Sequence, residues 1–427
     1  MGILSNIHNA FFSSPNHEAD NYDLSVKSYA DDGMDAFRSD NWSKLSSEQR
    51  LESLRDFSND YAEKIGLNET PNIVSVDGSY YGYYDRTGNT IGINLSANDN
   101  PYEALDTVMH ECNHGMQQQT IDAGNSTAAG YTDGDYAVIK AQNCSDIYIS
   151  NGIENETQTY ELDSNNVAVS NLSEMCSGMK DDPAYYEYMC NRETHFEAVN
   201  GLIADNRSYV NAIETNQISE AQSAGYISEE EAKTAIQSIN DGASQIRVDS
   251  INAGELATSE CISSSLSYAK TQHSSYESFN GDEEEASQMR DMNDRCIVHL
   301  SQGKELSEQK LESLKTEQAE YIASNNYGFY EVANDPVCRD YRSQIESLQN
   351  AVDNYQHSET MLESDNAMIG EQFGLEESNE QNISVNDYSS NISENMVETQ
   401  SNDTENVISD ESEDVSISMD SGEDITM

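Results

Sequence analysis

The chain is poor in basic residues and strongly acidic. It contains 21 lysines and arginines against 79 aspartates and glutamates, which gives a formal net charge of -58. Such an excess of negative charge repels phosphate backbones and anionic lipid surfaces, so nucleic acid is excluded as a partner and membrane-surface binding is disfavoured. A basic protein, as partner, substrate or inhibitor, is compatible with this charge.

Long apolar runs are also missing. No stretch approaches the roughly 20 consecutive apolar residues that a transmembrane helix needs, and no lysine or arginine precedes Lys27. The basic and apolar start of an ordinary signal peptide is therefore absent. We expect no membrane span and a soluble protein that is cytoplasmic or exported without a cleaved signal peptide.

Paired cysteines are the third absence. The 7 cysteines include no Cys-x-x-Cys pair. An odd number without such pairs argues against a disulfide framework and against a thiolate zinc cluster. We expect scattered free thiols in a reducing compartment.

Composition and periodicity divide the chain into four segments. Residues 1–40 are polar and indicate an irregular leader, whereas residues 41–206 contain the strand and helix patterns described below. Residues 207–370 are mainly helical, with short apolar stripes that favour a helical hairpin or loose bundle over a long coiled coil. Residues 371–427 have no basic residue and few apolar ones, so we expect a disordered acidic tail.

The second segment begins with a well-marked helix and then turns to strands. Apolar residues recur at steps of three and four up to Ile65, which indicates a helix capped by Ser46 or Ser47 and stopped by Gly66. Strand-like patterns follow at residues 73–76 and 89–95 with a tyrosine- and glycine-rich turn at 80–84 between them.

Two further helices are predicted after these strands. Asn100 and Pro101 have the residue types of a cap and a first helical position, and the helix they start runs on past Met109. Residues 120–180 are rich in Gly, Asn, Asp and Ser and indicate loops. The last helix of the segment begins near Asp182-Pro183.

The helix that starts at Asn100 carries the motif His110-Glu111-Cys112-Asn113-His114, which matches His-Glu-x-x-His. Residues four apart lie on one helix face, so both imidazoles can reach one metal ion. Glu111 is rotated by about 100° from His110, so it can act on a water instead. The motif therefore predicts a zinc site with His110 and His114 as ligands and Glu111 as general base. The remaining histidines outside the candidate helices have no ligand spacing and are predicted to be surface or structural: His8, His17, His273, His299 and His357.

Residues 89–119, and especially Gly92-Ile93-Asn94-Leu95 followed by Asn100 to Glu111, resemble the zincin metallopeptidases. Within them the chain is closest to small gluzincin-like domains of bacterial secreted effectors and polymorphic toxins. The resemblance is weaker over the rest of residues 42–205. It implies an α+β fold: a small zincin-like domain with a short sheet and active-site helices, then the mainly helical region and the tail. In zincins an extended substrate lies along the sheet edge before the active-site helix, which implies that residues 89–95 form that edge.

The resemblance also implies a third zinc ligand on a later helix. Gluzincin-like domains supply a glutamate there, followed closely by an acid and an alanine, and the comparable stretch is Arg192 to Ala198. Matched on Glu197-Ala198, the ligand position falls on His195. Glu197 and Glu193 are the alternatives within one helical turn.

The sequence thus predicts a zinc-dependent peptidase that hydrolyses peptide bonds by a metal-bound water, with Glu111 as general base. The resemblance implies a bacterial effector or toxin-like protease acting on a protein or peptide. The alternative is a catalytically inactive, acidic helical interaction protein with a zincin fold.

Overall fold

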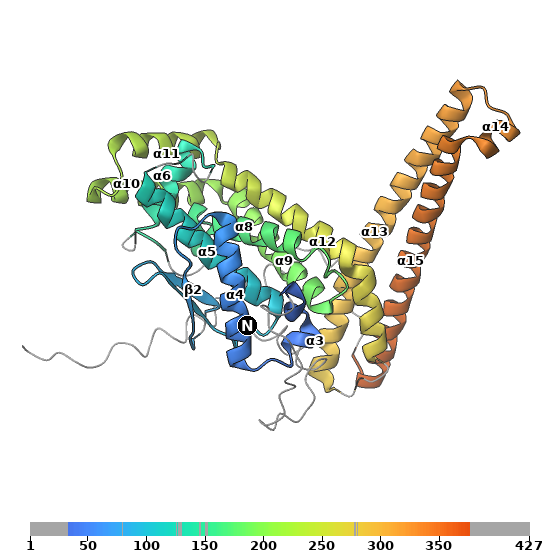
Figure 1. The fold of residues 1–427 in the computed structure, drawn as a ribbon, viewed down its shortest axis with the longest axis horizontal. Helices are drawn as coiled ribbons and strands as arrows, with labels where there is room; N and C mark the ends of the chain where they lie inside the picture. The colour runs from blue at the N-terminus through green and yellow to red at the C-terminus, as the bar shows by residue number, and fades with distance from the viewer. Residues whose placement is uncertain are drawn as a thin grey trace, which may run out of the picture. The chain divides into compact units, whose positions relative to one another are not determined.

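The computed structural model describes residues 33–375 apart from 79, 125, 127–129, 145–146, 150–152, 277–278 and 280. Within this part the chain is mainly helical, with a small mixed three-stranded sheet near the N-terminal end (Figure 1). The prediction of helices combined with a short sheet is therefore confirmed. The expected disordered tail, from residue 376 on, and residues 1–32 of the expected leader lie outside the described residues.

The first half of the described chain holds the sheet and the helices around it. Its elements are η1 Gly33–Phe37, α3 Ser39–Trp42, α4 Ser47–Ile65, β1 Asn72–Ser75, β2 Gly82–Asp85, β3 Thr90–Ile93, α5 Pro101–Ala123, α6 Asp133–Gln142, α7 Ile153–Glu156, α8 Thr159–Met175 and α9 Pro183–Asp205. The second half is helical: α10 Arg207–Ala224, α11 Glu229–Asp241, α12 Gln245–Tyr276, α13 Glu283–Ser324, α14 Phe329–Asn334 and α15 Pro336–Phe373.

Helix α4 begins and ends where the sequence predicts. The Ser46 side chain accepts a hydrogen bond from the backbone N–H of Gln49, and the Gln49 side chain in turn accepts one from the backbone N–H of Ser46. Gly66 ends the helix in the left-handed conformation at φ 82°, which glycine adopts at little cost. Helices α5 and α9 likewise begin at their predicted caps, Asn100 and Asp182.

The sheet has the strand order β1-β3-β2. β1 runs parallel to β3, with Ile73 opposite Ile91, and β2 runs antiparallel to β3 on its other side. Residues 80–84, predicted as a turn, therefore contribute most of a strand. The implication that residues 89–95 form the sheet edge is also wrong, because β3 is hydrogen-bonded on both sides and β1 and β2 are the edges.

The prediction of loops over residues 120–180 is wrong as well, because α6 and α8 lie there. The buried side of α8 carries polar residues such as Asp163, Ser164 and Asn165 among its apolar ones. A buried face of this kind leaves no clear apolar stripe, and the periodicity that signals a helix is lost.

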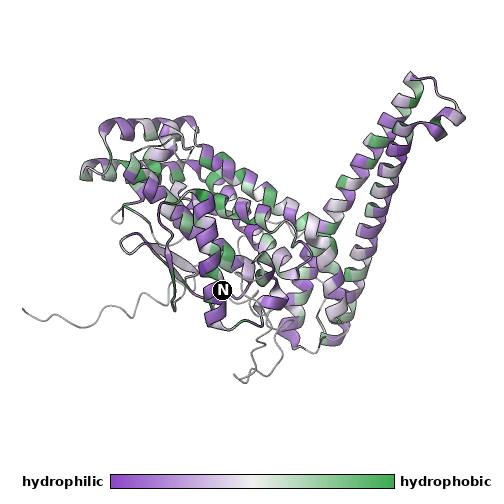
Figure 2. Cartoon of the chain, in the orientation of Figure 1, coloured by the Kyte–Doolittle hydropathy of each residue, from purple (hydrophilic) through white to green (hydrophobic). Residues whose placement is uncertain are grey.

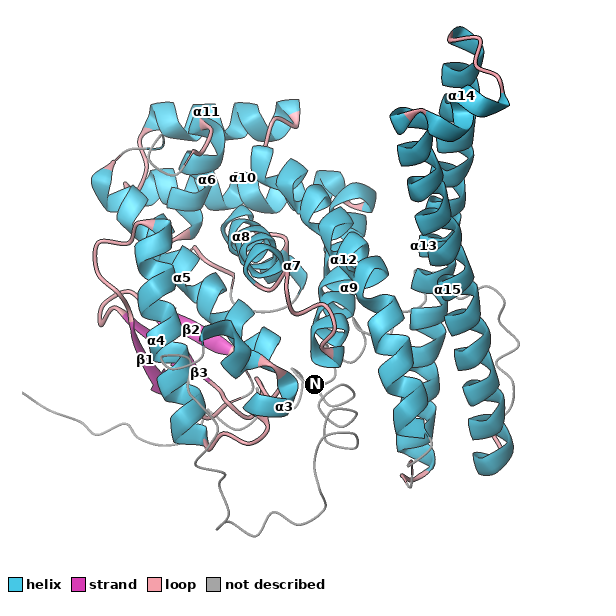
Figure 3. Cartoon of the chain, turned by 45° about the vertical axis from the view of Figure 1, so that its right-hand side comes forward, coloured by secondary structure: helices cyan, strands magenta, loops and turns pink. Residues whose placement is uncertain are grey.

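The sheet lies beside α4 and α5 (Figure 3). One large apolar cluster joins these elements to α8, α9, α12, α13 and α15, with Trp42, Phe57, Tyr102 and Phe196 fully buried in it. This cluster includes residues on both sides of residue 206, where the sequence predicts a domain boundary. The boundary itself stays a prediction. Phe37 and Ser39, in the segment predicted as an irregular leader, are also buried.

Helices α13 and α15 pack antiparallel along each other as a hairpin. Asn293 donates to Asn366 at 2.8 Å near one end, and Ser301 donates to Glu359 at 2.6 Å further along. Figure 2 shows hydrophobic and hydrophilic residues interspersed along both helices. The prediction that residues 207–370 are mainly helical is confirmed, and within them α13 and α15 form a hairpin. None of the described helices is both long and apolar enough to span a membrane.

Candidate metal centre

The His-Glu-x-x-His motif lies in the middle of α5, one of the most buried helices of the fold. Its first turn is fixed by Asn100, whose side chain accepts from the backbone N–H of Tyr102 at 2.9 Å and donates to the carbonyl of Ala184 at the start of α9. The start of the motif helix is thereby linked to α9, and the helix also packs against α8, α4 and the sheet.

Three ligand atoms converge at this motif. Nε2 of His110 and Nε2 of His114 are 3.0 Å apart. The Glu161 carboxylate from α8 completes the group, with Oε2 at 3.1 Å from His110 Nε2 and Oε1 at 3.6 Å from His114 Nε2. The expected pairing of the two histidines on one helix face is therefore observed, and a carboxylate from another helix faces them.

These distances fit a tetrahedral zinc ion. Zinc bonds of about 2.0–2.2 Å to nitrogen and oxygen at a tetrahedral angle separate the ligand atoms by roughly 3.3 Å. Two imidazoles and one carboxylate also form a donor set that zinc uses in catalytic sites, where a fourth position stays open. The donor chemistry and the spacing together fit a zinc site formed by His110, His114 and Glu161.

The ring of His114 is held from its far side. Its Nδ1 is 2.8 Å from Oε1 of Gln117 and 3.1 Å from the hydroxyl of Ser164, while the Tyr160 ring stacks on it with centroids 4.3 Å apart. Gln117 in turn donates to Asp163 at 2.8 Å. Contacts to the second ring nitrogen fix the orientation of a ligating imidazole, so Nε2 is aimed at the site.

Glu161 is positioned by a tyrosine as well as by the two imidazoles. The Tyr148 hydroxyl donates to Oε1 of Glu161 at 2.7 Å and itself accepts from Asn155. Burial alone would raise the pKa of Glu161, but the His114 charge and the hydrogen bonds from both histidines hold it well below its usual range. Glu161 is therefore a carboxylate, as a metal ligand must be.

The charge of the cluster favours a cation. Burial lowers the pKa of His110, but the hydrogen bond to Glu161 and the negative charges of Glu111 and Glu161 outweigh it and raise the pKa to about 9. The site thus attracts positive charge to the point between the two imidazoles, and a divalent cation competes there with a proton.

Glu111 lies beside this group on the same helix and is 7% exposed. Burial raises its pKa, and the His110 and His114 charges lower it less than burial raises it. A carboxyl with a raised pKa is better suited to take up a proton and return it than an ordinary glutamate.

His195, the first choice for a third ligand, lies on α9 and is not one of the three converging residues. Its Nε2 is buried, has no hydrogen-bond partner and is 3.8 Å from the Glu156 carboxylate. Burial and then the charges of Arg192 and His110 hold its pKa well below the usual range, so the ring is neutral. Its place as a ligand stays a prediction.

The two alternatives to His195 point away from the motif. Glu193 contacts His299 of α13, with Oε2 at 2.9 Å from Nε2. Glu197, on the same helix, is half-buried, and the neighbouring charges that affect its pKa are those of Glu193 and Arg295. Neither belongs to the group at His110 and His114.

Sequence reasoning did not identify Glu161. It lies 51 residues from His110 in a segment predicted as loops, and no fixed spacing relates it to the motif. A helix prediction for residues 159–175 would have brought it into consideration, because the resemblance implies a glutamate on a later helix.

Known proteins offer no guide beyond this geometry: no protein-family model, no curated protein and no solved structure matches the chain.

Proposed function

We propose that the chain is a zinc-dependent peptidase, with His110, His114 and Glu161 as metal ligands and Glu111 as general base. The observation that carries the proposal is the convergence of two Nε2 atoms and a carboxylate at 3.0–3.6 Å, with a second, proton-accepting carboxyl beside them. A glutamate on a later helix is also what the zincin resemblance implies.

The zinc ion, when bound, acts as a Lewis acid that lowers the pKa of a water to about 7. Glu111 takes the proton of the attacking water and returns it to the leaving amine. His195 is neutral and its Nε2 lacks a partner, so as the Nε2–H tautomer it can donate to the oxygen on which negative charge develops.

The sheet supports a position for the substrate. β2 is an edge strand, and a Cβ atom added to Gly82 would lie 3.6 Å from Cγ of Glu111. An extended peptide that adds to the β2 edge would pass beside the general base, in the manner of β-strand addition. The acidic chain favours peptides with basic residues.

Metal analysis and a peptide library test this proposal together. The full chain, purified without chelator, should contain zinc at the motif, and a peptide library should show discrete cleavages by mass spectrometry. Glu111→Gln should keep the zinc and lose turnover by at least 100-fold. A chain that lacks zinc at the motif, or a Glu111→Gln variant that cleaves normally, contradicts the proposal.

The alternative is an interaction protein that holds the metal without turnover. The low exposure of the cluster favours it, because the side chains of His110, His114 and Glu161 are only 16%, 8% and 8% exposed. This alternative requires full zinc occupancy. It also requires that the unmutated chain and the Glu111→Gln variant do not differ in their cleavage of any peptide.

A further inference from the structure

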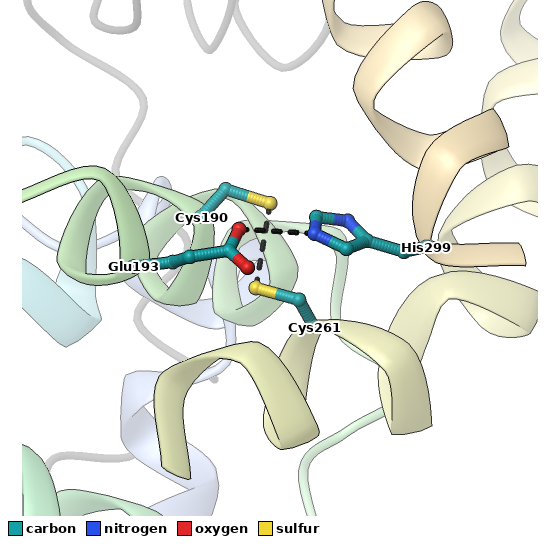
Figure 4. A group of neighbouring side chains, drawn as sticks. All are labelled: Cys190, Glu193, Cys261 and His299. Atoms are coloured by element: carbon teal, nitrogen blue, oxygen red, sulfur yellow. Dashed lines mark hydrogen bonds and ion pairs between the residues drawn. The ribbon is translucent and has the colours of Figure 1, made fainter. Parts of the chain in front are cut away.

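A second group of metal-ligating side chains lies on the other side of α9. It comprises Cys190 and Glu193 of α9, Cys261 of α12 and His299 of α13, and Figure 4 shows the four side chains pointing toward one another from these helices. One ligand atom from each residue lies within 4.8 Å of all the others. The residues are far apart in sequence, with 71 positions between the cysteines and 106 between Glu193 and His299.

The distances within the group are close to those around a zinc ion. The two sulfur atoms are 3.6 Å apart, and Nε2 of His299 is 2.9 Å from Oε2 of Glu193. Zinc–sulfur bonds of about 2.3 Å at a tetrahedral angle separate two sulfurs by roughly 3.8 Å. Small movements of the imidazole and the carboxylate would then complete four-coordination.

The ligands are buried and one of them is oriented from behind. Cys190 and Cys261 are fully buried and His299 is 4% exposed. Nδ1 of His299 is 2.8 Å from the hydroxyl of Tyr186, which directs Nε2 toward the group as the outer contacts of ligating histidines do.

The contacts within the group shift the pKa values of two of its members. Burial raises the pKa of Cys190, but the hydrogen bond from Cys261 and the charges of Arg295 and His299 hold it well below its usual range. Burial likewise lowers the pKa of His299, but Cys190 and Glu193 raise it to about 9.

We propose that Cys190, Glu193, Cys261 and His299 form a structural zinc site that fastens α13, and with it the hairpin, to α9 and α12. The site is independent of the proposed peptidase centre. Four protein ligands leave no position open for a water, as in structural zinc sites. Two thiolates favour zinc over calcium or magnesium, which take oxygen ligands.

This proposal runs against one expectation from the sequence, that the absence of Cys-x-x-Cys argues against a thiolate zinc cluster. His299, which the sequence predicts to be surface or structural, is buried. The seven cysteines are free, as predicted, but Cys190 and Cys261 are brought together by helix packing rather than by local spacing.

Cobalt distinguishes the two proposed sites by the absorption spectrum that each would give. Thiolate ligands give Co²⁺ an intense near-ultraviolet charge-transfer band, whereas two imidazoles and a carboxylate do not. The full chain loaded with Co²⁺ should show this band, and the His110→Ala, His114→Ala double variant should keep it with one metal per chain. Failure of the peptidase proposal would leave this result unchanged.

Variants assign the band to its ligands. The Cys190→Ser, Cys261→Ser double variant should lose the band and one bound zinc, while Cys296→Ser should keep both. Cys296 is a matched control because it is buried on α13 yet lies outside the group. Metal-loaded chain without the band, or a Cys190–Cys261 disulfide found by mass spectrometry in freshly purified protein, overturns the proposal.

Discussion

Glu161 and His195 compete for the role of third ligand, and their surroundings differ. Glu161 contacts both imidazoles and accepts a hydrogen bond from Tyr148. His195 contacts neither imidazole within hydrogen-bond distance, and its buried Nε2 has no partner. Under the proposed function, Glu161 is therefore the ligand and His195 is the group that contacts the substrate.

Substitution of each residue separates these roles. Glu161→Ala should lower zinc affinity at least tenfold and abolish turnover, because one of three ligands is lost. His195→Ala should retain the zinc and lower kcat by about 100-fold or more. Zinc affinity is measured by competition with a chromophoric chelator. The control is Glu174→Ala, an exposed change on α8, the helix that carries Glu161. Loss of zinc in His195→Ala would restore His195 as the ligand.

A buried carboxyl away from both sites gives a prediction about stability. Glu187 on α9 is 1% exposed and its Oε1 has no hydrogen-bond partner. Burial, followed by the negative charge of Asp182, raises its pKa well above the usual range. The folded state therefore holds this proton more tightly than the unfolded state, and stability is lost as pH rises above the ordinary Glu value of about 4.3.

Glu187→Gln removes this pH dependence. The urea midpoint of the variant should match that of the unmutated chain near pH 4 and exceed it increasingly at pH 7 and 9. The matched change Glu174→Gln, at an exposed site, should leave the midpoint unchanged at every pH. A variant that is less stable than the unmutated chain at pH 9 would show that the Glu187 charge is compensated.

At the scale of the elements, β2 packs closely against α5 beside the motif. A Cβ atom at Gly82 would lie 2.6 Å from Cγ2 of Thr107 and 3.0 Å from the carbonyl oxygen of Gly92. Any side chain larger than hydrogen must push the strand away from the motif helix or away from β3.

Gly82→Ala should therefore destabilise the fold by about 1–3 kcal/mol, as overpacking in a close-packed core does. It should also lower turnover, because β2 borders Glu111. Gly201→Ala is the matched control: Gly201 is exposed on α9 with nothing within 4 Å of an added Cβ, and alanine should stabilise that helix by about 0.5–1 kcal/mol. Both values come from urea denaturation, and equal stability of Gly82→Ala and the unmutated chain would contradict the packing argument.

Helices with strong local signals could be predicted from the sequence, and those with buried polar faces could not. α4, α5 and α9 carry caps and apolar stripes, so their bounds and the pairing of His110 with His114 follow from local spacing. α8 carries Glu161 on a partly polar buried face, and the sequence of such a helix looks like that of a loop. Contacts between helices that are far apart in sequence, such as those of Glu161 and Cys261, depend on tertiary packing. They produce no periodic pattern in the sequence from which they could be predicted.

At the scale of the whole molecule, the main feature that affects stability is the excess of negative charge. With 79 acidic and 21 basic side chains, at least 58 acids lack a lysine or arginine to pair with, since each base can neutralise one. Compaction brings these charges closer together than in the unfolded chain, so their repulsion destabilises the folded state. Salt shortens the Debye length from about 30 Å at 0.01 M to about 8 Å at 0.15 M and weakens that repulsion.

The stability of the chain should therefore rise with salt. Between 0.01 and 0.15 M NaCl we expect the urea midpoint to increase at constant slope, the opposite of what a fold held by surface ion pairs would show. Choline chloride should have the same effect at equal ionic strength, because the screening is not specific to sodium. The metal-loaded chain is used throughout, so that salt does not act through loss of zinc. A midpoint that falls with salt would mean that the attraction within pairs such as Arg247–Glu214 and Lys180–Glu260 outweighs the repulsion among the acids.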